Sequence, residues 1–493
     1  MSIRFVLLCL AAICAIGASL FKLEQARNGI EIDAFYVGQT PVTRYRLPET
    51  DAPIVVVAHG FAGSTQIMQA YSLTLAQAGY EVLTFDFEGH GRNSVPMSGD
   101  VTSIDGTTRL LVLQTSTIIK AVRQMDNAVN GIALLGHSMA TDVLLRALIA
   151  EQEAGNSIAT MVGISMFSEV VNESTPSSLL IINGQWEKRL REPALAQLQL
   201  LDPDAREGET VTQNGVVRRV VVAPNMEHVG VLYSEAAISE ALMWLNLTFN
   251  RDSMQTPVRM GGWILLLLLG IVLLFKPLVS LLPTTNIRYP EIPAPRYWAA
   301  ILLPAIVTPL LALLPGTSFL PVLVADYLML HLGVYGLLQL LLIRTWSAVS
   351  VKASVYAALV LIFWGVVVFG VSLDRYAASF LPTAGRLNII IVLSVSAVVF
   401  MLADAMVTGA GRGRLSRRLV ARMALFVSLA AAAFIDSERL IFLVLILPVL
   451  LVFYLIYGLM GRWVAQRCGV LASGLGLGVC LAWALGVSFP LFV

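Results

Sequence analysis

Residues 136–140 read Gly-His-Ser-Met-Ala, a spacing that presents a serine for nucleophilic attack. The pattern fits the G-x-S-x-G elbow, with alanine in the last place, in which the serine occupies a strained turn and its hydroxyl projects above a sheet. The flanking residues must be small because strand and helix backbones nearly touch there. An apolar stretch at 132–135 precedes the motif, and a helix is predicted over 140–150. We therefore interpret Ser138 as a nucleophile and not as an ordinary turn serine.

The elements that must position this serine alternate between strand and helix. The apolar run at 54–58 is typical of a strand buried on both faces of a parallel sheet. Further strands are predicted at 30–37, 42–47, 81–85, 160–165, 178–182 and 217–223, and helices at 67–78, 107–125 and 234–247. This order predicts an α/β domain with a doubly wound, mostly parallel sheet.

Composition narrows the class of protein. Of 493 residues, 57% are hydrophobic and 13% charged, which is too apolar for a wholly soluble protein. The net charge of +1 and the lack of interleaved basic and aromatic residues argue against a nucleic-acid partner. None of the four cysteines lies in the globular part, so the sequence indicates no disulfide framework, no metal cluster and no cofactor there.

Three stretches carry a family resemblance. Residues 59–64 (His-Gly-Phe-Ala-Gly-Ser), residues 86–91 (Asp-Phe-Glu-Gly-His-Gly) and the elbow together resemble the α/β-hydrolase superfamily, nearest its serine aminopeptidase, monoglyceride lipase and esterase branch. The resemblance covers about residues 30–250. It implies the fold and a serine nucleophile, and the serine argues against a dehalogenase, in which Asp takes that place. Substrate does not follow, because one fold hosts many chemistries.

The resemblance also implies a catalytic histidine late in the domain, because the order in this fold is nucleophile, acid, histidine. His228 follows the last predicted strand and precedes the final helix, so it is predicted to be the general base. The other histidines are assigned elsewhere: His59 to the oxyanion turn, His90 to the loop before the nucleophile, His137 beside the serine and pointing away from it, and His331 to the membrane region.

The acid is expected just after the strand that ends at Ile182, where the first carboxylate is Glu187. The family usually has Asp there, and Glu is an accepted variant. Glu187 would orient His228 and stabilise its cationic form. The alternative is an ordinary exposed carboxylate beside two basic residues, with Asp202 and Asp204 in the next loop as fallback acids.

The resemblance implies that the backbone N–H groups of Phe61 and Met139 bind the oxyanion of acyl transfer. Asp86 and Arg92 are expected to hold loops in place. One departure from the lipase-like pattern is the short stretch between residues 166 and 178, which leaves no room for a sizeable helical cap. The site is therefore expected to be open, or to be covered by something else such as the membrane half.

Apolar runs indicate the membrane segments. Residues 1–22 predict a signal anchor or a cleaved signal peptide, of which we favour the anchor, followed by the hydrolase domain at 28–250. The region 260–493 predicts about eight spans, because each run is near the ~20 residues that cross hydrocarbon. The runs are 260–283, 297–314, 318–343, 354–373, 388–409, 419–435, 439–460 and 469–493. The boundaries at 314–318 and 435–439 are the least defined.

Arginine and lysine are distributed unevenly between the loops. With a cytoplasmic N-terminus, the cytoplasmic loops carry Arg288, Arg296, Arg344, Lys352, Arg412, Arg414, Arg417, Arg418, Arg462 and Arg467, and the outer loops carry only Arg375, Arg386 and Arg439. This obeys the positive-inside rule and predicts a multi-pass plasma (inner) membrane protein whose hydrolase domain is outside, or periplasmic in a bacterium.

Ionisable residues within the predicted spans are Asp326, His331, Asp404 and Lys276. Asp326 and His331 are five residues apart, which is about 140° around a helix, so they share no face. Intramembrane charges mark functional sites by default. We favour pairing between helices here, or placement near an interface.

The sequence thus predicts a membrane-anchored serine hydrolase that cleaves an ester, thioester or amide. The membrane context favours membrane lipids and small acyl-ester or lipid-linked molecules as substrates and partners. An acyltransferase with the same triad is one alternative, since both reactions use an acyl-enzyme. The other is a transporter or membrane scaffold whose globular domain is a binding or sensing module.

Overall fold

The computed structural model describes residues 3–100, 104–285, 291–314, 320–322, 324–344 and 350–492. Its internal contacts divide the chain into two compact units. The first unit contains residues 18–265 and the short segment Asp374–Ser379. The second contains the residues up to Gly17 and the chain from Leu266 to Leu373 and from Phe380 to Phe492.

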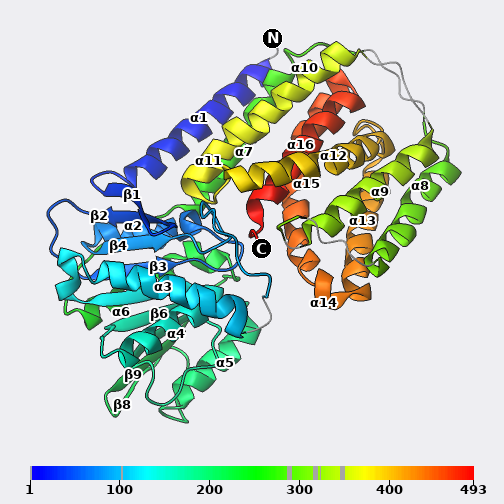
Figure 1. Ribbon diagram of the computed structural model, residues 1–493. Helices are drawn as coiled ribbons and strands as arrows, with labels where there is room; N and C mark the ends of the chain where they lie inside the picture. The colour runs from blue at the N-terminus through cyan, green and yellow to red at the C-terminus, as the bar shows by residue number, and fades with distance from the viewer. Residues whose placement is uncertain are drawn as a thin grey trace. The chain divides into compact units, whose positions relative to one another are not determined.

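A mixed sheet forms the centre of the first unit (Figure 1). Across the sheet the strands of the described residues follow the order β1 (Glu31–Val37), β2 (Thr40–Arg46), β4 (Glu81–Phe85), β3 (Ile54–Ala58), β5 (Ile132–His137), β6 (Thr160–Ile164), β7 (Ser178–Gly184), β9 (Val216–Ala223) and β8 (Thr210–Gln213). Neighbours from β4 to β9 are parallel, and the outer pairings are antiparallel. The predicted fold class, with its mostly parallel sheet, is confirmed.

The central strands are buried along their whole length. Every residue of β3, β4, β5 and β6 is buried. This is the environment that a continuous apolar run predicts for a strand covered on both faces. β1 at the sheet edge has no buried residue, which matches its alternating sequence.

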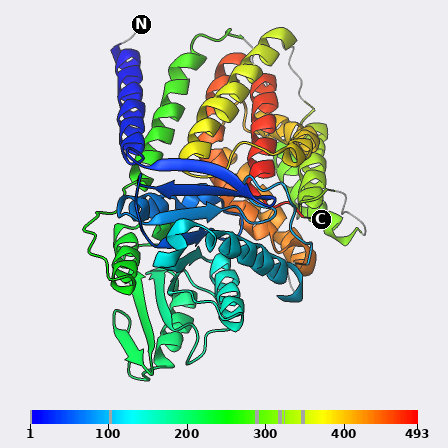
Figure 2. The ribbon, with the colours of Figure 1, turned by 60° about the vertical axis from the view of Figure 1, so that its left-hand side comes forward.

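The helices of this unit pack in pairs against the sheet (Figures 1 and 2). α2 (Gln69–Gln77) contacts α6 (Glu235–Thr248), and α3 (Arg109–Val122) contacts α4 (Met139–Glu153). α5 (Lys188–Gln199) packs against β7 and β9. The short helical turns are η1 (Thr65–Met68), η2 (Ile104–Thr108), η3 (Asp126–Asn130) and η4 (Gly230–Tyr233).

The strand order reverses direction beside β3. The chain passes from β3 to β4 on one side and then crosses to β5 on the other side. Ala58, the last residue of β3, lies opposite Gly136 of β5, so the carboxyl ends of these two strands are level. Sites of open α/β sheets form at such a switch point, outside the carboxyl ends of the strands.

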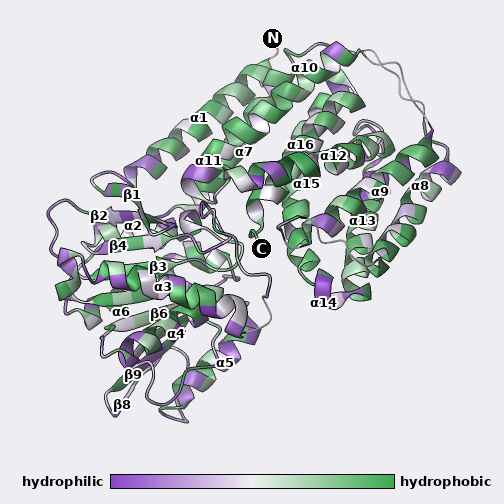
Figure 3. Cartoon of the chain, in the orientation of Figure 1, coloured by the Kyte–Doolittle hydropathy of each residue, from purple (hydrophilic) through white to green (hydrophobic). Residues whose placement is uncertain are grey.

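Long helices make up the second unit. They are α1 (Ile3–Gln25), α7 (Gly261–Val279), α8 (Ala294–Val307), η5 (Thr308–Leu313), α9 (Ala325–Ile343), α10 (Val351–Ile362), η6 (Phe363–Val368), α11 (Phe369–Tyr376), α12 (Ala384–Val407), α13 (Leu415–Ile435), α14 (Ser437–Leu440), α15 (Leu443–Cys468) and α16 (Val470–Ser488). Parts of α1, α7 and α11 belong to the first unit. Among the described residues, nine helical segments are long and apolar enough to cross a membrane. Figure 3 shows this apolar character along the helices. The finding is consistent with the predicted multi-pass membrane protein.

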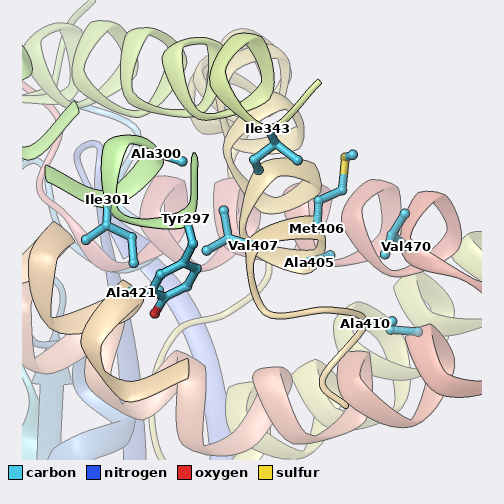
Figure 4. Packing of buried hydrophobic residues seen from close by; sticks show 11 residues of the cluster. Tyr297, Ala300, Ile301, Ile343, Ala405, Met406, Val407, Ala410, Ala421 and Val470 are labelled. Carbon is cyan, nitrogen blue, oxygen red and sulfur yellow. The ribbon is translucent and has the colours of Figure 1, made fainter. Parts of the chain in front are cut away.

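Glycines allow the helices around α12 to approach closely. A Cβ on Gly478 of α16 would lie 2.4 Å from the Cα of Val398, and one on Gly336 of α9 would lie 2.6 Å from the Cα of Phe400. Small residues at such crossings are typical of membrane helix packing. Another apolar cluster links α8, α9, α12, α13, α15 and α16 around Tyr297 and Met406 (Figure 4).

The ionisable residues of the predicted spans have partners on other elements. Asp404 on α12 pairs with Arg422 on α13 at 3.3 Å. His331 on α9 lies 3.0 Å from the hydroxyl of Ser428 on α13. Asp326 accepts the backbone N–H of Leu320 at 2.6 Å. The contacts of Asp404 and His331 match the favoured interpretation, which is pairing between helices.

Candidate active site

Ser138 occupies a strained turn between β5 and α4. Its φ of +53° and ψ of −121° place a residue other than glycine in a sparsely populated conformation, which persists only where its surroundings fix it. Its N–H donates to the carbonyl of Ile164 at 2.9 Å, and its carbonyl accepts the hydroxyl of Thr141 at 2.7 Å. A Cβ on Gly136 would lie 2.7 Å from the side chain of Leu144, which explains the small residue before the turn.

The structure brings the three predicted triad residues together in one hydrogen-bonded series. The Nε2 of His228 lies 2.9 Å from the Oγ of Ser138. The Nδ1 of His228 lies 2.6 Å from the Oε1 of Glu187. These residues follow the parallel strands β5, β9 and β7, whose carboxyl ends lie at one edge of the sheet. The arrangement is that of a nucleophile, a base and an orienting acid.

Glu187 is held as a carboxylate. Burial alone would raise its pKa, but three hydrogen bonds outweigh burial, and the pKa lies below its usual value. One oxygen accepts from His228, and the other accepts the N–H of Gly184 at 2.5 Å and the hydroxyl of Ser165 at 2.8 Å. The negative charge therefore remains available to stabilise a protonated His228.

The fallback acids lie elsewhere. Asp202 and Asp204 are both exposed in the turn after α5. An oxygen of Asp202 accepts the backbone N–H of Asp204 at 3.1 Å, a contact that closes their own turn. Only Glu187, among the three candidate acids, contacts His228.

The turn after β3 lies directly against the elbow. A Cβ on Gly60 would lie 3.0 Å from the Cβ of Ser138, so glycine is needed for this approach. Phe61, the next residue, was predicted to supply one oxyanion donor. Met139, the other, is the first residue of α4, and the N–H groups of a first helical turn have no intrahelical partner. The N-terminal end of a helix also favours negative charge.

Buried polar residues hold this turn. His59 is fully buried, and burial lowers its pKa, so the ring is neutral. Its Nδ1 donates to the carbonyl of Gly60 at 2.8 Å, and its Nε2 accepts the N–H of Phe87 at 3.2 Å. The carboxylate of Asp86 accepts the N–H groups of Thr65 and Arg92, each at 2.8 Å. Asp86 thus ties the loop after β4 to the turn after β3.

His137 has a contact that sequence reasoning missed. Its Nε2 donates to the backbone carbonyl of His228 at 2.9 Å, and the two rings are 4.8 Å apart between centroids. Burial, and secondarily the nearby His228, lower the pKa of His137 to about 4. The neutral ring therefore supports the loop that carries the general base. Its place next to the elbow serine was the only signal in the sequence.

A segment far along the chain also supports the site. Asp374–Ser379, which belongs to the same unit as the sheet, comprises the end of α11 and the three residues after it. The N–H of Ser379 donates to the hydroxyl of Ser64 at 3.0 Å, at the end of the turn after β3. The carboxylate of Asp374 pairs with the guanidinium of Arg92 at 2.5 Å. No local motif in the sequence indicates these contacts.

The site is open to solvent. Residues 165–177 connect β6 and β7 and, as all of them are described, can be seen to form no helix, in agreement with the predicted lack of a cap. The side chain of His228 is 43% exposed. Three apolar side chains in the loops after β6, β7 and β9 are also exposed, namely Phe167, Trp186 and Val229. Within the described residues, no group of three His, Cys, Asp or Glu could hold a metal ion.

Comparison with known proteins identifies the class of the sheet domain. Residues 49–226 match the family described as serine aminopeptidase, S33. Similar solved structures include a candidate lipase from Acinetobacter baumannii AYE (15% identity, 47% of this chain and 97% of that one, TM-score 0.34). An epoxide hydrolase from Vigna radiata has 13% identity, covers 45% of this chain and 98% of its own, and has a TM-score of 0.32. A dienelactone hydrolase from Anabaena variabilis ATCC 29413 has 16% identity, the same coverages of 45% and 98%, and a TM-score of 0.32. The curated proteins gave no match.

The strand order, the elbow and the family match together define an α/β-hydrolase fold in the N-terminal half. The C-terminal half is helical and carries many long apolar helices. The comparisons and the fold thus support a hydrolase domain in the N-terminal half, and its reaction is taken up below.

The buried His137 makes the stability of the sheet domain depend on pH. Its pKa is about 4 in the fold and ~6.5 in an unfolded chain, so the unfolded state binds more protons between these values. The contribution of the neutral His137 to the free energy of unfolding is about 3 kcal/mol. It is complete above pH ~6.5 and is lost as the pH falls toward 4. We expect calorimetry to show that lowering the pH from 7 to 5 decreases the midpoint temperature of unfolding less in His137→Gln than in the parent. An equal decrease in both proteins would contradict this assignment.

Proposed function

We propose that this protein is a membrane-embedded serine hydrolase that cleaves an ester, thioester or amide through an acyl-enzyme on Ser138. The observation that carries the proposal is the hydrogen-bonded series of Ser138, His228 and Glu187, with distances of 2.9 and 2.6 Å. Both lie within the range in which a base can take a proton from a nucleophile and an acid can orient that base.

The acylation step would use each of these groups once. The Oγ of Ser138 attacks the carbonyl carbon while the Nε2 of His228 takes the hydroxyl proton. The carboxylate of Glu187 stabilises the imidazolium that forms. The carbonyl oxygen becomes negative and is stabilised by the N–H groups of Phe61 and Met139. When the tetrahedral intermediate collapses, the bond to the leaving group breaks, and His228 returns its proton to that group.

Deacylation repeats the same steps with water. His228 removes a proton from the attacking water, the acyl–Ser138 bond breaks, and the proton returns to the Ser138 oxygen. The 43% exposure of the His228 side chain gives water access to the base.

Apolar surface around the site favours an acyl substrate. Phe167, Trp186 and Val229 are 59%, 63% and 46% exposed, and each lies within three residues of a strand end or of the triad. Burying such side chains against an acyl chain contributes about 25 cal/mol per Å² of apolar area. Together with the long apolar helices of the second unit, this supports lipids, acyl esters or lipid-linked molecules as the substrate class.

We infer that the hydrolase domain faces the outside of a plasma membrane. The positive-inside rule places the connection between α11 and α12 on the outer side. The segment Asp374–Ser379, which spans the end of α11 and the start of that connection, belongs to the same compact unit as the sheet. The contacts of Asp374 and Ser379 with Arg92 and Ser64 support a common side for this connection and the hydrolase domain.

Labelling with a fluorophosphonate probe tests the nucleophile. We expect the full-length protein to be labelled, and Ser138→Ala and His228→Ala to lose the label because the serine is absent or no longer activated. Glu187→Gln should slow labelling by a factor on the order of 10³–10⁴, because the amide cannot stabilise the imidazolium. Asp202→Asn, which removes an exposed carboxylate of the same region, should label like the parent. A folded parent that is not labelled would remove the basis of this proposal.

The topology can be tested in a variant without the four native cysteines. We expect Ser174→Cys, on an exposed loop of the sheet domain, to react with a membrane-impermeant maleimide on intact cells. Arg414→Cys, on the exposed connection between α12 and α13, should react only after the cells are opened. The reverse pattern would place the hydrolase domain on the cytoplasmic side.

A further inference from the structure

A polar cavity lies within the helical unit, between α12, α13, α15 and α16. Its charged lining consists of Asp404 on α12, Arg418 and Arg422 on α13, and Arg462 on α15. The hydroxyl residues Thr408 and Ser473 complete the polar part of the wall. The cavity is separate from the hydrolase site, since all its lining residues belong to the second unit.

The positive charges of this lining exceed its negative charge. Asp404 is the only carboxylate among the described residues of the lining, and it pairs with Arg422 at 3.3 Å. The guanidinium of Arg422 also lies over the ring of Tyr454, 4.2 Å from its centroid, so it is held on two sides. Arg418 and Arg462 each bring a further positive charge to the cavity.

These two arginines lack partners among the residues that the structure describes. The Nε atoms of Arg418 and Arg462 are buried and make no hydrogen bond there. Neither guanidinium forms an ion pair with a described carboxylate, whereas that of Arg422 pairs with Asp404. Both side chains are partly buried, so the unpaired Nε of each has lost water without gaining a hydrogen bond.

Small residues leave room beside the guanidinium groups. A Cβ on Gly411, at φ +70°, would lie 2.5 Å from the Cγ of Arg462. A Cβ on Gly458 would lie 3.8 Å from an Nη of Arg422. Glycine at position 411 therefore lets the backbone approach Arg462 closely, whereas the distance at Gly458 is an ordinary contact.

We propose that this cavity binds a phosphate-type anion through Arg418 and Arg462, with Arg422 fixed by Asp404 at its side. Guanidinium groups present paired N–H donors that match phosphate oxygens, and such charge-assisted bonds are the stronger kind. One anion with about two negative charges would neutralise the excess of the lining. A lipid headgroup and inorganic phosphate share this chemistry, and the site does not depend on the hydrolase reaction.

The test uses the full-length protein in maltoside micelles, which contain no phosphate. The thermal unfolding midpoint is measured against added inorganic phosphate at constant ionic strength and, separately, against added phosphatidylglycerol. We expect at least one of the two to raise the midpoint in a saturable way. Arg418→Gln and Arg462→Gln should weaken the apparent affinity about 10-fold or more, since each loses a charge-assisted contact. Arg462→Lys, which keeps the charge, should have a smaller effect.

Arg344→Gln is the matched control, because Arg344 is an exposed arginine at the end of α9 and outside the cavity. It should respond like the parent. A response to inorganic phosphate would identify a free anion as sufficient, and a response to phosphatidylglycerol alone would identify a lipid headgroup. No saturable response in the parent, or an equal response of Arg462→Gln and Arg344→Gln, would overturn the proposal.

Discussion

The close approach of two turns at the carboxyl edge of the sheet is the constraint on which the site depends. Gly60 and Ser138 lie so near each other that a Cβ on the glycine would be 3.0 Å from the serine Cβ. Ser138 is held at a φ of +53° by hydrogen bonds from its N–H to the carbonyl of Ile164 and from the hydroxyl of Thr141 to its carbonyl. The strain is thus offset by the packed sheet, and the hydroxyl is fixed where a base can reach it.

The other groups reach this point because parallel strands end at one edge. His228 is 90 residues from Ser138 along the chain, yet their side chains are 2.9 Å apart. Their loops follow β9 and β5, and Glu187 follows β7, which lies between β6 and β9 in the sheet. A shift in the register of any of these strands would move a side chain by about 3.3 Å per residue, more than a hydrogen bond tolerates.

Much of this arrangement could be predicted because its determinants are local. The apolar runs at β3 and β5 indicate buried strands, and the small residues around Ser138 indicate a crowded turn. Glu187 and His228 follow from chain order once the fold is inferred. The boundary of β7 was less accurate, since it continues two residues beyond Ile182 to Gly184. The strand β8 was missed because Thr-Val-Thr-Gln carries no apolar run.

Long-range side-chain contacts could not be predicted in the same way. The bond from His137 to the carbonyl of His228 depends on how two loops pack, and neither loop encodes its partner. Ser64 and Ser379 are separated by 315 residues, and nothing in either stretch marks the other. Arg418 and Arg462 were predicted as loop charges, and their convergence with Arg422 on one cavity follows only from the packing of α12, α13 and α15.

The central claim is that Ser138 forms an acyl-enzyme. The most direct measurement is to mix the full-length protein with a chromogenic acyl ester, quench in acid within the first turnover and map the acylated peptide by mass spectrometry. The account predicts one acyl group on Ser138, formed with a burst of released alcohol and absent in Ser138→Ala. Turnover of the ester without an acylated peptide, or with the acyl group on another residue, would contradict it.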